Sequence, residues 1–153
     1  SMFPAKIGQE LGFHQLLWTD AKTHTFIEES GTMNIMLMID GVLITPSEES
    51  DTILRGITKR SVIELAESWG IPVEERKVRI AELITAIKDG SLTEVFGAGT
   101  AATIAPIAKI GYRDEVLEMP PVEGREFSKK VVAFMNDIKS GKEPDTFGWT
   151  LKV

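Results

Sequence analysis

The chain has 153 residues, a formal net charge of −6 and a sequence pI of about 5.0, with 42% hydrophobic and 26% charged residues. These values predict one soluble globular domain, and the acidic balance argues against a nucleic-acid partner. The absence of cysteine excludes disulfides and cysteine ligands, and with two histidines we expect no metal site. No apolar run is long enough to span a membrane and no secretion signal is visible in residues 1–12, so we expect a cytoplasmic protein without a membrane partner.

The first third of the chain has the patterns of β-strands. The β-prone segments His14–Asp20 and Thr25–Glu29 predict two strands joined by a turn. The nearly continuous apolar run Met33–Ile39 is typical of a strand that is covered on both faces. Asp40-Gly41, followed by the β-prone residues Val42–Thr45, predicts a hairpin.

The remaining two thirds mix helices with further strands. Apolar residues at helical spacing predict helices over Ile57–Trp69, Ile80–Lys88 and Arg125–Ile138. Strands are predicted at Val73–Arg79, Glu94–Phe96, Ala102–Ile110 and Phe147–Val153. Because hairpin-linked strands and helices are mixed, the fold class predicted from the pattern is α+β.

The segment Gly97-Ala98-Gly99-Thr100-Ala101 is rich in small residues between two apolar runs. Glycine lets a backbone turn sharply and lets another molecule approach it closely. The Thr100 hydroxyl and the N–H groups of Thr100 and Ala101 could then bind a phosphate or a carboxylate. A plain tight turn explains the same residues.

Gly56-Ile57-Thr58 stands at the start of the predicted helix. A helix N-terminus has free N–H groups and the positive end of the helix dipole, so it attracts phosphate. Thr58 could cap the helix or bind the anion with its hydroxyl. An ordinary N-cap without a ligand is the alternative interpretation.

Two neighbouring carboxylates, Glu28 and Glu29, end the second predicted strand. In a strand, adjacent side chains point to opposite faces, so we expect one of them to face a site and the other to face away. The alternative is that both are solvated carboxylates at the end of a strand.

In this order, the motifs at 27–34, 56–60 and 95–106 resemble those of the branched-chain amino-acid aminotransferases, fold-type IV enzymes that use pyridoxal 5'-phosphate (PLP). The resemblance runs from about Phe13 to Val153 and includes Phe147-Gly148-Trp149. It implies that residues 1–153 form a single domain, the C-terminal pseudo-barrel of the D-amino acid aminotransferase-like enzymes. It also implies a cytoplasmic homodimer.

The resemblance implies roles for five residues. Glu29 would face the pyridine nitrogen of the cofactor. The backbone of Ile57 and Thr58 and the hydroxyl of Thr100 would bind its phosphate. The backbone N–H groups of Thr100 and Ala101 would bind the substrate carboxylate.

The sequence departs from the family at one point. The family's Schiff-base lysine lies in a K-x-x-x-N-Y-type motif upstream of the matching region, and no such motif is present here. The lysines of this chain are mostly on polar faces, and none has an apolar setting that suggests a cofactor lysine; Lys109 comes nearest. We therefore expect the large domain alone, without the N-terminal domain or a catalytic residue, and inactive by itself.

The function that the resemblance implies is amino transfer between leucine, isoleucine or valine and 2-oxoglutarate in the intact enzyme. Two alternatives remain. One is another fold-type IV enzyme, a D-amino acid aminotransferase or a 4-amino-4-deoxychorismate lyase. The other is a non-catalytic binding domain from a truncated gene.

Overall fold

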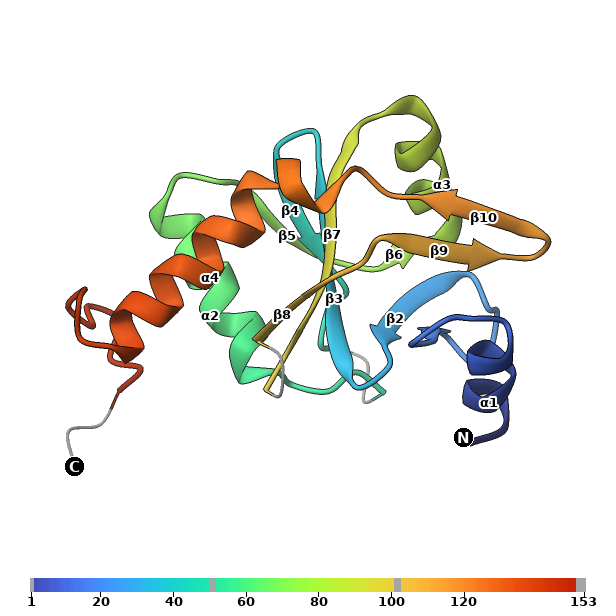
Figure 1. The fold of residues 1–153 in the computed structure, drawn as a ribbon, viewed down its shortest axis with the longest axis horizontal. Helices are drawn as coiled ribbons and strands as arrows, with labels where there is room; N and C mark the ends of the chain where they lie inside the picture. The colour runs from blue at the N-terminus through green and yellow to red at the C-terminus, as the bar shows by residue number, and fades with distance from the viewer. Residues whose placement is uncertain (1, 50–51, 101–102, 151–153) are drawn as a thin grey trace.

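The computed structural model describes residues 2–49, 52–100 and 103–150. Over these residues the chain forms an eight-stranded sheet, a separate two-stranded sheet, four α-helices and one short 3-10 helix (Figure 1). The elements are α1 (Met2–Glu10), β1 (Leu17–Thr19), β2 (Phe26–Ser30), β3 (Met33–Ile39), β4 (Val42–Thr45), α2 (Ile57–Ser68), β5 (Val73–Glu75), β6 (Val78–Arg79), α3 (Ile80–Asp89), β7 (Leu92–Gly99), β8 (Thr103–Pro106), β9 (Lys109–Tyr112), β10 (Glu115–Glu118), η1 (Val122–Gly124) and α4 (Glu126–Lys139). The predicted α+β mixture is confirmed.

β3 is the centre of the large sheet. It pairs with β7 along one edge, and along the other edge it pairs first with β2 and then with β4, always antiparallel. Ile35, Met36 and Leu37 are fully buried, which confirms the prediction of a strand covered on both faces. Met36 packs in a cluster with residues of α2 and α4, whereas Ile35 and Leu37 pack in a second cluster with residues of α3. Helices therefore cover both faces of the sheet (Figure 1).

The hairpin predicted from Asp40-Gly41 joins β3 to β4. Asp40 has φ 49° and Gly41 has φ 76°, and the flanking Ile39 and Val42 are paired. Positive φ at both central residues is the geometry that favours Asp-Gly in a two-residue hairpin. The local sequence therefore determines this turn.

Two buried charged residues tie α4 to the sheet. The carboxylate of Glu94 on β7 accepts hydrogen bonds from the N–H groups of Phe127 (2.7 Å) and Ser128 (2.9 Å) in the first turn of α4. The guanidinium of Arg125, which is 2% exposed, donates to the carbonyl oxygens of Val95 (2.8 Å), Ile107 (2.7 Å) and Pro120 (2.7 Å). One side chain thus binds β7 and the two loops that flank the small sheet.

Several predicted elements differ from the structure. Val73–Arg79 is divided into β5, parallel to β4, and β6, antiparallel to β2, because the chain leaves one strand partner and joins another. The predicted strand Ala102–Ile110 is divided between β8 and β9, which belong to different sheets. Residues 147–150 are not a strand, and 151–153 lie outside the described residues. There the rings of Phe147 and Trp149 stack at 4.6 Å, and Asp145 binds the N–H of Thr150 at 2.6 Å.

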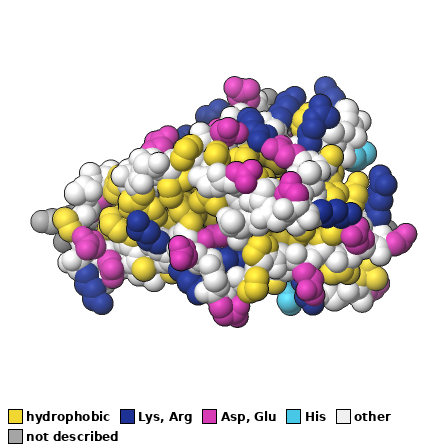
Figure 2. Space-filling model, turned by 90° about the horizontal axis from the view of Figure 1, so that it is seen from above, with side chains coloured by type: hydrophobic (Ala, Val, Ile, Leu, Met, Phe, Trp, Pro, Cys, Tyr) yellow, Lys and Arg dark blue, Asp and Glu magenta, His cyan; other side chains and the backbone are white. Residues whose placement is uncertain are grey.

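The surface carries both signs of charge. Figure 2 shows Lys and Arg side chains mixed with Asp and Glu around a hydrophobic area on the face seen from above. Among the described helices, none is long and apolar enough to cross a membrane.

Replacing Arg125 by methionine tests its structural role. Arg125→Met keeps most of the side-chain volume but removes the guanidinium donor of three carbonyl groups, of which, within the described part of the chain, only that of Val95 keeps another donor, the Ile107 N–H. We therefore expect a loss of about 3 kcal/mol in the free energy of unfolding. Urea unfolding followed by circular dichroism measures it. The exposed Lys142 gives the control Lys142→Met, for which we expect a change within about 0.5 kcal/mol. Equal effects of the two substitutions would contradict the role given to Arg125.

The loop before β2 makes stability depend on pH. Hydrogen bonds to its carboxylate from the Phe26 N–H and the Thr23 side chain hold the pKa of Asp20 well below its usual range. The charged form is favoured in the folded state, so its stabilisation is present above the unfolded pKa of about 4 and is lost as the pH falls below it. We expect Asp20→Asn to destabilise the protein at pH 7 and to have a smaller effect as the pH falls below 4. A wild-type-to-variant difference that is constant over this range in urea unfolding would refute this assignment.

Candidate functional site

The sheet register brings the three sequence motifs to one end of the sheet. Glu29 of β2 is paired with Asn34 of β3, Asn34 with Ala98 of β7, and Ala98 with Ile104 of β8. The end of β2, the start of β3, the end of β7 and the start of β8 therefore lie at the same edge of the sheet. α2 starts at this end too, at the lower edge of Figure 1. Segments that are distant in sequence thus meet at a common edge.

The turn predicted at Gly97-Ala98-Gly99 is wrong, because these residues continue β7. β7 continues through Gly99, and Thr100 is the turn residue that follows it; residues 101 and 102 lie outside the described residues. These glycines instead let the Met33 side chain lie close to the backbone of β7. A Cβ on Gly97 would lie 2.9 Å from Met33 Cε, and a Cβ on Gly99 would lie 2.8 Å from Met33 Cγ. Met33 packs over this part of β7, and its side chain needs the space.

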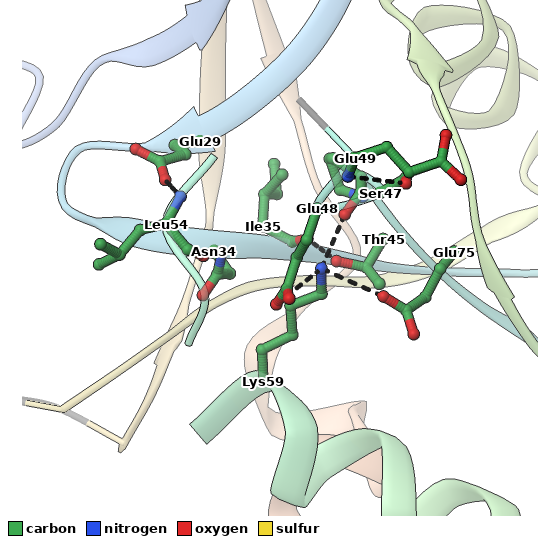
Figure 3. Close-up of polar contacts among 11 residues, drawn as sticks. Glu29, Asn34, Ile35, Thr45, Ser47, Glu48, Glu49, Leu54, Lys59 and Glu75 are labelled. Atoms are coloured by element: carbon green, nitrogen blue, oxygen red, sulfur yellow. Dashed lines mark hydrogen bonds and ion pairs between the residues drawn. The ribbon is translucent and has the colours of Figure 1, made fainter. Parts of the chain in front are cut away.

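Glu29 lines a cleft of about 650 Å³. Its Oε1 accepts a hydrogen bond of 2.6 Å from the N–H of Leu54, as Figure 3 shows. The lining consists of Glu29, Gly31, Thr32, Glu48, Thr52, Ile53, Leu54 and Arg55. Glu28 is not in this lining, but its Oε1 accepts a hydrogen bond of 2.9 Å from the hydroxyl of Thr52. Both carboxylates thus bind the segment before α2, and Glu29 is the one that faces the cleft.

The start of α2 is held in place by a buried amide. Asn34 is 4% exposed and its Nδ2 donates 2.8 Å to the carbonyl oxygen of Leu54. Gly56 is the N-cap, with extended backbone, and a Cβ there would lie 2.0 Å from Asn34 Oδ1. The prediction that Thr58 could cap the helix is wrong, because Gly56 occupies the cap position. Within the described part of the chain, no side chain caps α2, so no side chain competes there for the N–H groups of the first turn.

The predicted site residues lie near one another, but not all of them line the cleft. Glu29 does; Ile57, 82% exposed, and Thr58, half-buried, are at the start of α2. Thr100 is exposed just after β7, and Ala101 lies outside the described residues. The lining residue Arg55 precedes the N-cap of α2, so the cleft extends from the Glu29 carboxylate to the start of the helix.

Lys59 is a functional candidate that the sequence reasoning missed. It is fully buried, against the expectation that no lysine has such a setting. The helical spacing predicts its burial, since Lys59 lies on the same face of the helix as the buried residues Val62, Ile63 and Ala66. Lys109, the predicted nearest case, is exposed and forms an ion pair of 3.8 Å with Glu118.

The arrangement suits an elongated ligand with two different ends. The Glu29 carboxylate favours a protonated nitrogen, whereas the N-terminus of α2 favours an anion.

Among the described residues, no group of three or more His, Cys, Asp or Glu side chains could hold a metal ion.

The contact between Gly56 and Asn34 can be tested by a double-mutant cycle. Gly56→Ala must displace the Asn34 amide and break its bond to Leu54, so we expect a loss of about 1–3 kcal/mol in the free energy of unfolding. In an Asn34→Ala background the clash is absent, so the same change should cost at least 0.5 kcal/mol less, by the usual size of contact couplings. Urea unfolding of the four proteins measures the coupling. Strict additivity would show that the two residues do not constrain each other.

Comparisons with known proteins show which proteins this chain is similar to. Branched-chain-amino-acid aminotransferase 2 of Bacillus subtilis is 43% identical across 100% of this chain and 42% of its own length. The crystal structure of a branched-chain aminotransferase from Thermoproteus uzoniensis superposes with a TM-score of 0.75 at 32% identity, over 97% of this chain and 44% of that one. An aminotransferase from Brucella abortus bound to the co-factor PLP superposes with a TM-score of 0.65 at 26% identity, over 86% of this chain and 41% of that one.

These likenesses confirm the predicted resemblance to branched-chain aminotransferases and the fold-type IV class of the domain. The chain spans less than half the length of each of these proteins. The family described as amino-transferase class IV matches residues 8–110. Since this match covers more than half of the 153 residues, the chain belongs to the class IV amino-transferases.

Proposed function

We propose that this chain is the PLP-binding large domain of a branched-chain amino-acid aminotransferase, which transfers an amino group between leucine, isoleucine or valine and 2-oxoglutarate. The observation that carries the proposal is the cleft that is lined by Glu29 and by Arg55, the residue just before the N-cap of α2. The 43% identity to the B. subtilis enzyme over the full length of this chain supports it.

The residues of the cleft fit the cofactor. PLP, when bound, supplies a ring that accepts electrons from the reacting carbon of the substrate. Glu29 would face the ring nitrogen and keep its proton in place, because a nearby negative charge favours the protonated form. The Leu54 N–H donates to Oε1 of this carboxylate and so fixes its orientation.

The anionic groups would bind at the adjoining edge. The N–H groups of Ile57 and Thr58 would hold the phosphate, because the first turn of a helix has N–H groups without intrahelical partners. The hydroxyl of Thr100 would add a further donor to the phosphate. The N–H groups of Thr100 and Ala101 would bind the substrate carboxylate; Ala101 lies outside the described residues.

The proposal includes parts beyond this domain. The lysine that holds the cofactor covalently would come from a segment outside the 153 residues, because the sequence has no K-x-x-x-N-Y-type motif. The intact enzyme would be a cytoplasmic homodimer, with branched-chain amino acids and 2-oxo acids as its substrates. The chain alone would then bind the cofactor weakly and would not catalyse transfer.

Binding of pyridoxine 5'-phosphate tests the site in this chain. This alcohol cannot condense with lysine amines, so its binding reports the non-covalent site alone. We expect ¹H–¹⁵N shifts at Ile57, Thr58 and Thr100, and about tenfold weaker binding for Glu29→Gln, since a charge-assisted hydrogen bond becomes neutral.

Glu28→Gln is the matched control. It removes the same charge one residue away, outside the cleft lining, so we expect the affinity to change by less than about twofold. Equal weakening by both substitutions would contradict the assignment of Glu29. In a protein that joins this chain to a lysine-bearing upstream segment, Glu29→Gln should also slow leucine transamination by at least about 10²-fold, and Glu28→Gln should not.

A further inference from the structure

The ammonium of Lys59 is the meeting point of three chain segments. Nζ donates a hydrogen bond of 2.8 Å to the carbonyl oxygen of Pro46. It lies 3.5 Å from Glu48 Oε1 and 3.4 Å from Glu75 Oε2, the two ion pairs drawn as dashed lines in Figure 3. A side chain on the first turn of α2 therefore binds the chain just after β4 and the end of β5.

We propose that Lys59 is a positioning residue: it closes the segment from Pro46 to Lys59 and thereby fixes the part of the cleft wall that this segment forms, together with the start of α2. The proposal rests on the function proposed above, because it concerns the same cleft. It assigns Lys59 no contact with the cofactor, since the side chain is fully buried among protein groups.

The segment that Lys59 closes carries most of the cleft wall. Five lining residues lie between Pro46 and Lys59, namely Glu48, Thr52, Ile53, Leu54 and Arg55. The hydrogen bond from Lys59 to Pro46 joins positions thirteen residues apart. Because it shortens the free length of the segment, this bond limits how far the wall can move. Residues 50 and 51 of the segment lie outside the described residues.

A second set of contacts holds the same segment from the sheet. Leu54 donates its N–H to Glu29 and accepts from Asn34 Nδ2 through its carbonyl oxygen. Lys59 and these two residues thus hold the segment at separate points. A shift of the α2 start would move Leu54 relative to Glu29, and small displacements of binding groups weaken a site strongly.

The charge of Lys59 fits positioning better than simple core stability. Burying an ammonium is costly, and well-packed apolar residues often match or exceed a buried ion pair in stability. A methionine could fill the volume but could not bind the Pro46 carbonyl. Glu48 Oε1 is buried without a hydrogen-bond partner in the described structure, so the nearby ammonium is what offsets its burial. The charge therefore selects one position of the segment.

Amide hydrogen exchange in the whole 153-residue chain tests the proposal without any ligand. The amides of Leu54, bonded to Glu29, and Arg60, bonded to the Gly56 carbonyl, report the segment and the first turn of α2. In Lys59→Met we expect both to exchange at least tenfold faster, while Met36 and Phe96 in the sheet change by less than threefold. Lys59→Arg, which retains the donors, should remain within threefold of wild type at all four amides.

Lys88→Met is the matched control. Lys88 is an exposed helical lysine in an ion pair of 3.5 Å with Glu115, so its loss should leave Leu54 and Arg60 unchanged. Unchanged exchange at these two amides in a folded Lys59→Met protein would overturn the proposal. An equal acceleration at Met36 and Phe96 would also overturn it, because it would mean a loss of global stability alone. If Lys59→Met does not fold, the same measurement is made on Glu48→Gln, for which we expect amide exchange to become several-fold faster at Leu54 and Arg60 only.

A ligand measurement separates this proposal from the proposed function. Lys59→Met should bind pyridoxine 5'-phosphate at least fivefold more weakly than wild type, and Lys59→Arg should bind within twofold of it. If wild type does not bind the compound, the proposed function fails, and the exchange measurement still decides whether Lys59 holds the segment. If Lys59→Met binds as wild type does, the positioning proposal fails and the proposed function stands.

Discussion

The antiparallel register of β3 with β2 and β7 is the constraint on which the rest of the site depends. It places Glu29, Asn34 and Ala98 in one row across three strands. Because β3 is buried on both faces, a slip of one residue would exchange its side chains between the two clusters and put Met36 where Ile35 and Leu37 pack. The packing of the core therefore fixes the position of a polar site at the edge of the sheet.

From this row, the fold reaches α2 through polar contacts. Asn34 binds the carbonyl and Glu29 the N–H of Leu54, and Lys59 binds the same segment at its beginning. The cost of burying or ordering each of these side chains is offset by its hydrogen bond to a backbone group, and the position of that group is fixed by the fold. A site made of backbone N–H groups needs such support, because its donors cannot adjust by side-chain rotation.

The sequence predicts well what local pattern determines. The apolar run of β3 and the Asp-Gly turn after it need no information from distant residues. The role of Gly97 and Gly99 could not be predicted from local pattern, because these glycines make room for Met33, which is far away in sequence. For the same reason, Val73–Arg79 looks like one strand although its two halves pair with β4 and β2. Glu29 could be named from its motif, but its bond to Leu54 depends on a segment 25 residues further along the chain.

For Lys59, the helical spacing and the residue type predict opposite degrees of burial, and the spacing is the one that the structure confirms. Its helical stripe predicts burial, whereas a lysine ordinarily predicts a solvated face. The three partners that make burial possible come from segments on either side of α2 in the sequence, and no local pattern reveals them.

Among the residues that the structure describes, no side chain caps the start of α2, and this follows from the same geometry. A serine, threonine or aspartate at an N-cap commonly stabilises a helix by about 1 kcal/mol relative to alanine. At position 56 the Asn34 amide leaves no room for a Cβ, so glycine is required and a side-chain cap is sterically excluded. The helix gives up this stabilisation, and its first turn is held instead by Lys59 from within. A helix that is anchored from its buried side can leave its N-terminal N–H groups to a ligand, and this arrangement links the burial of one lysine to the chemistry proposed for the cleft.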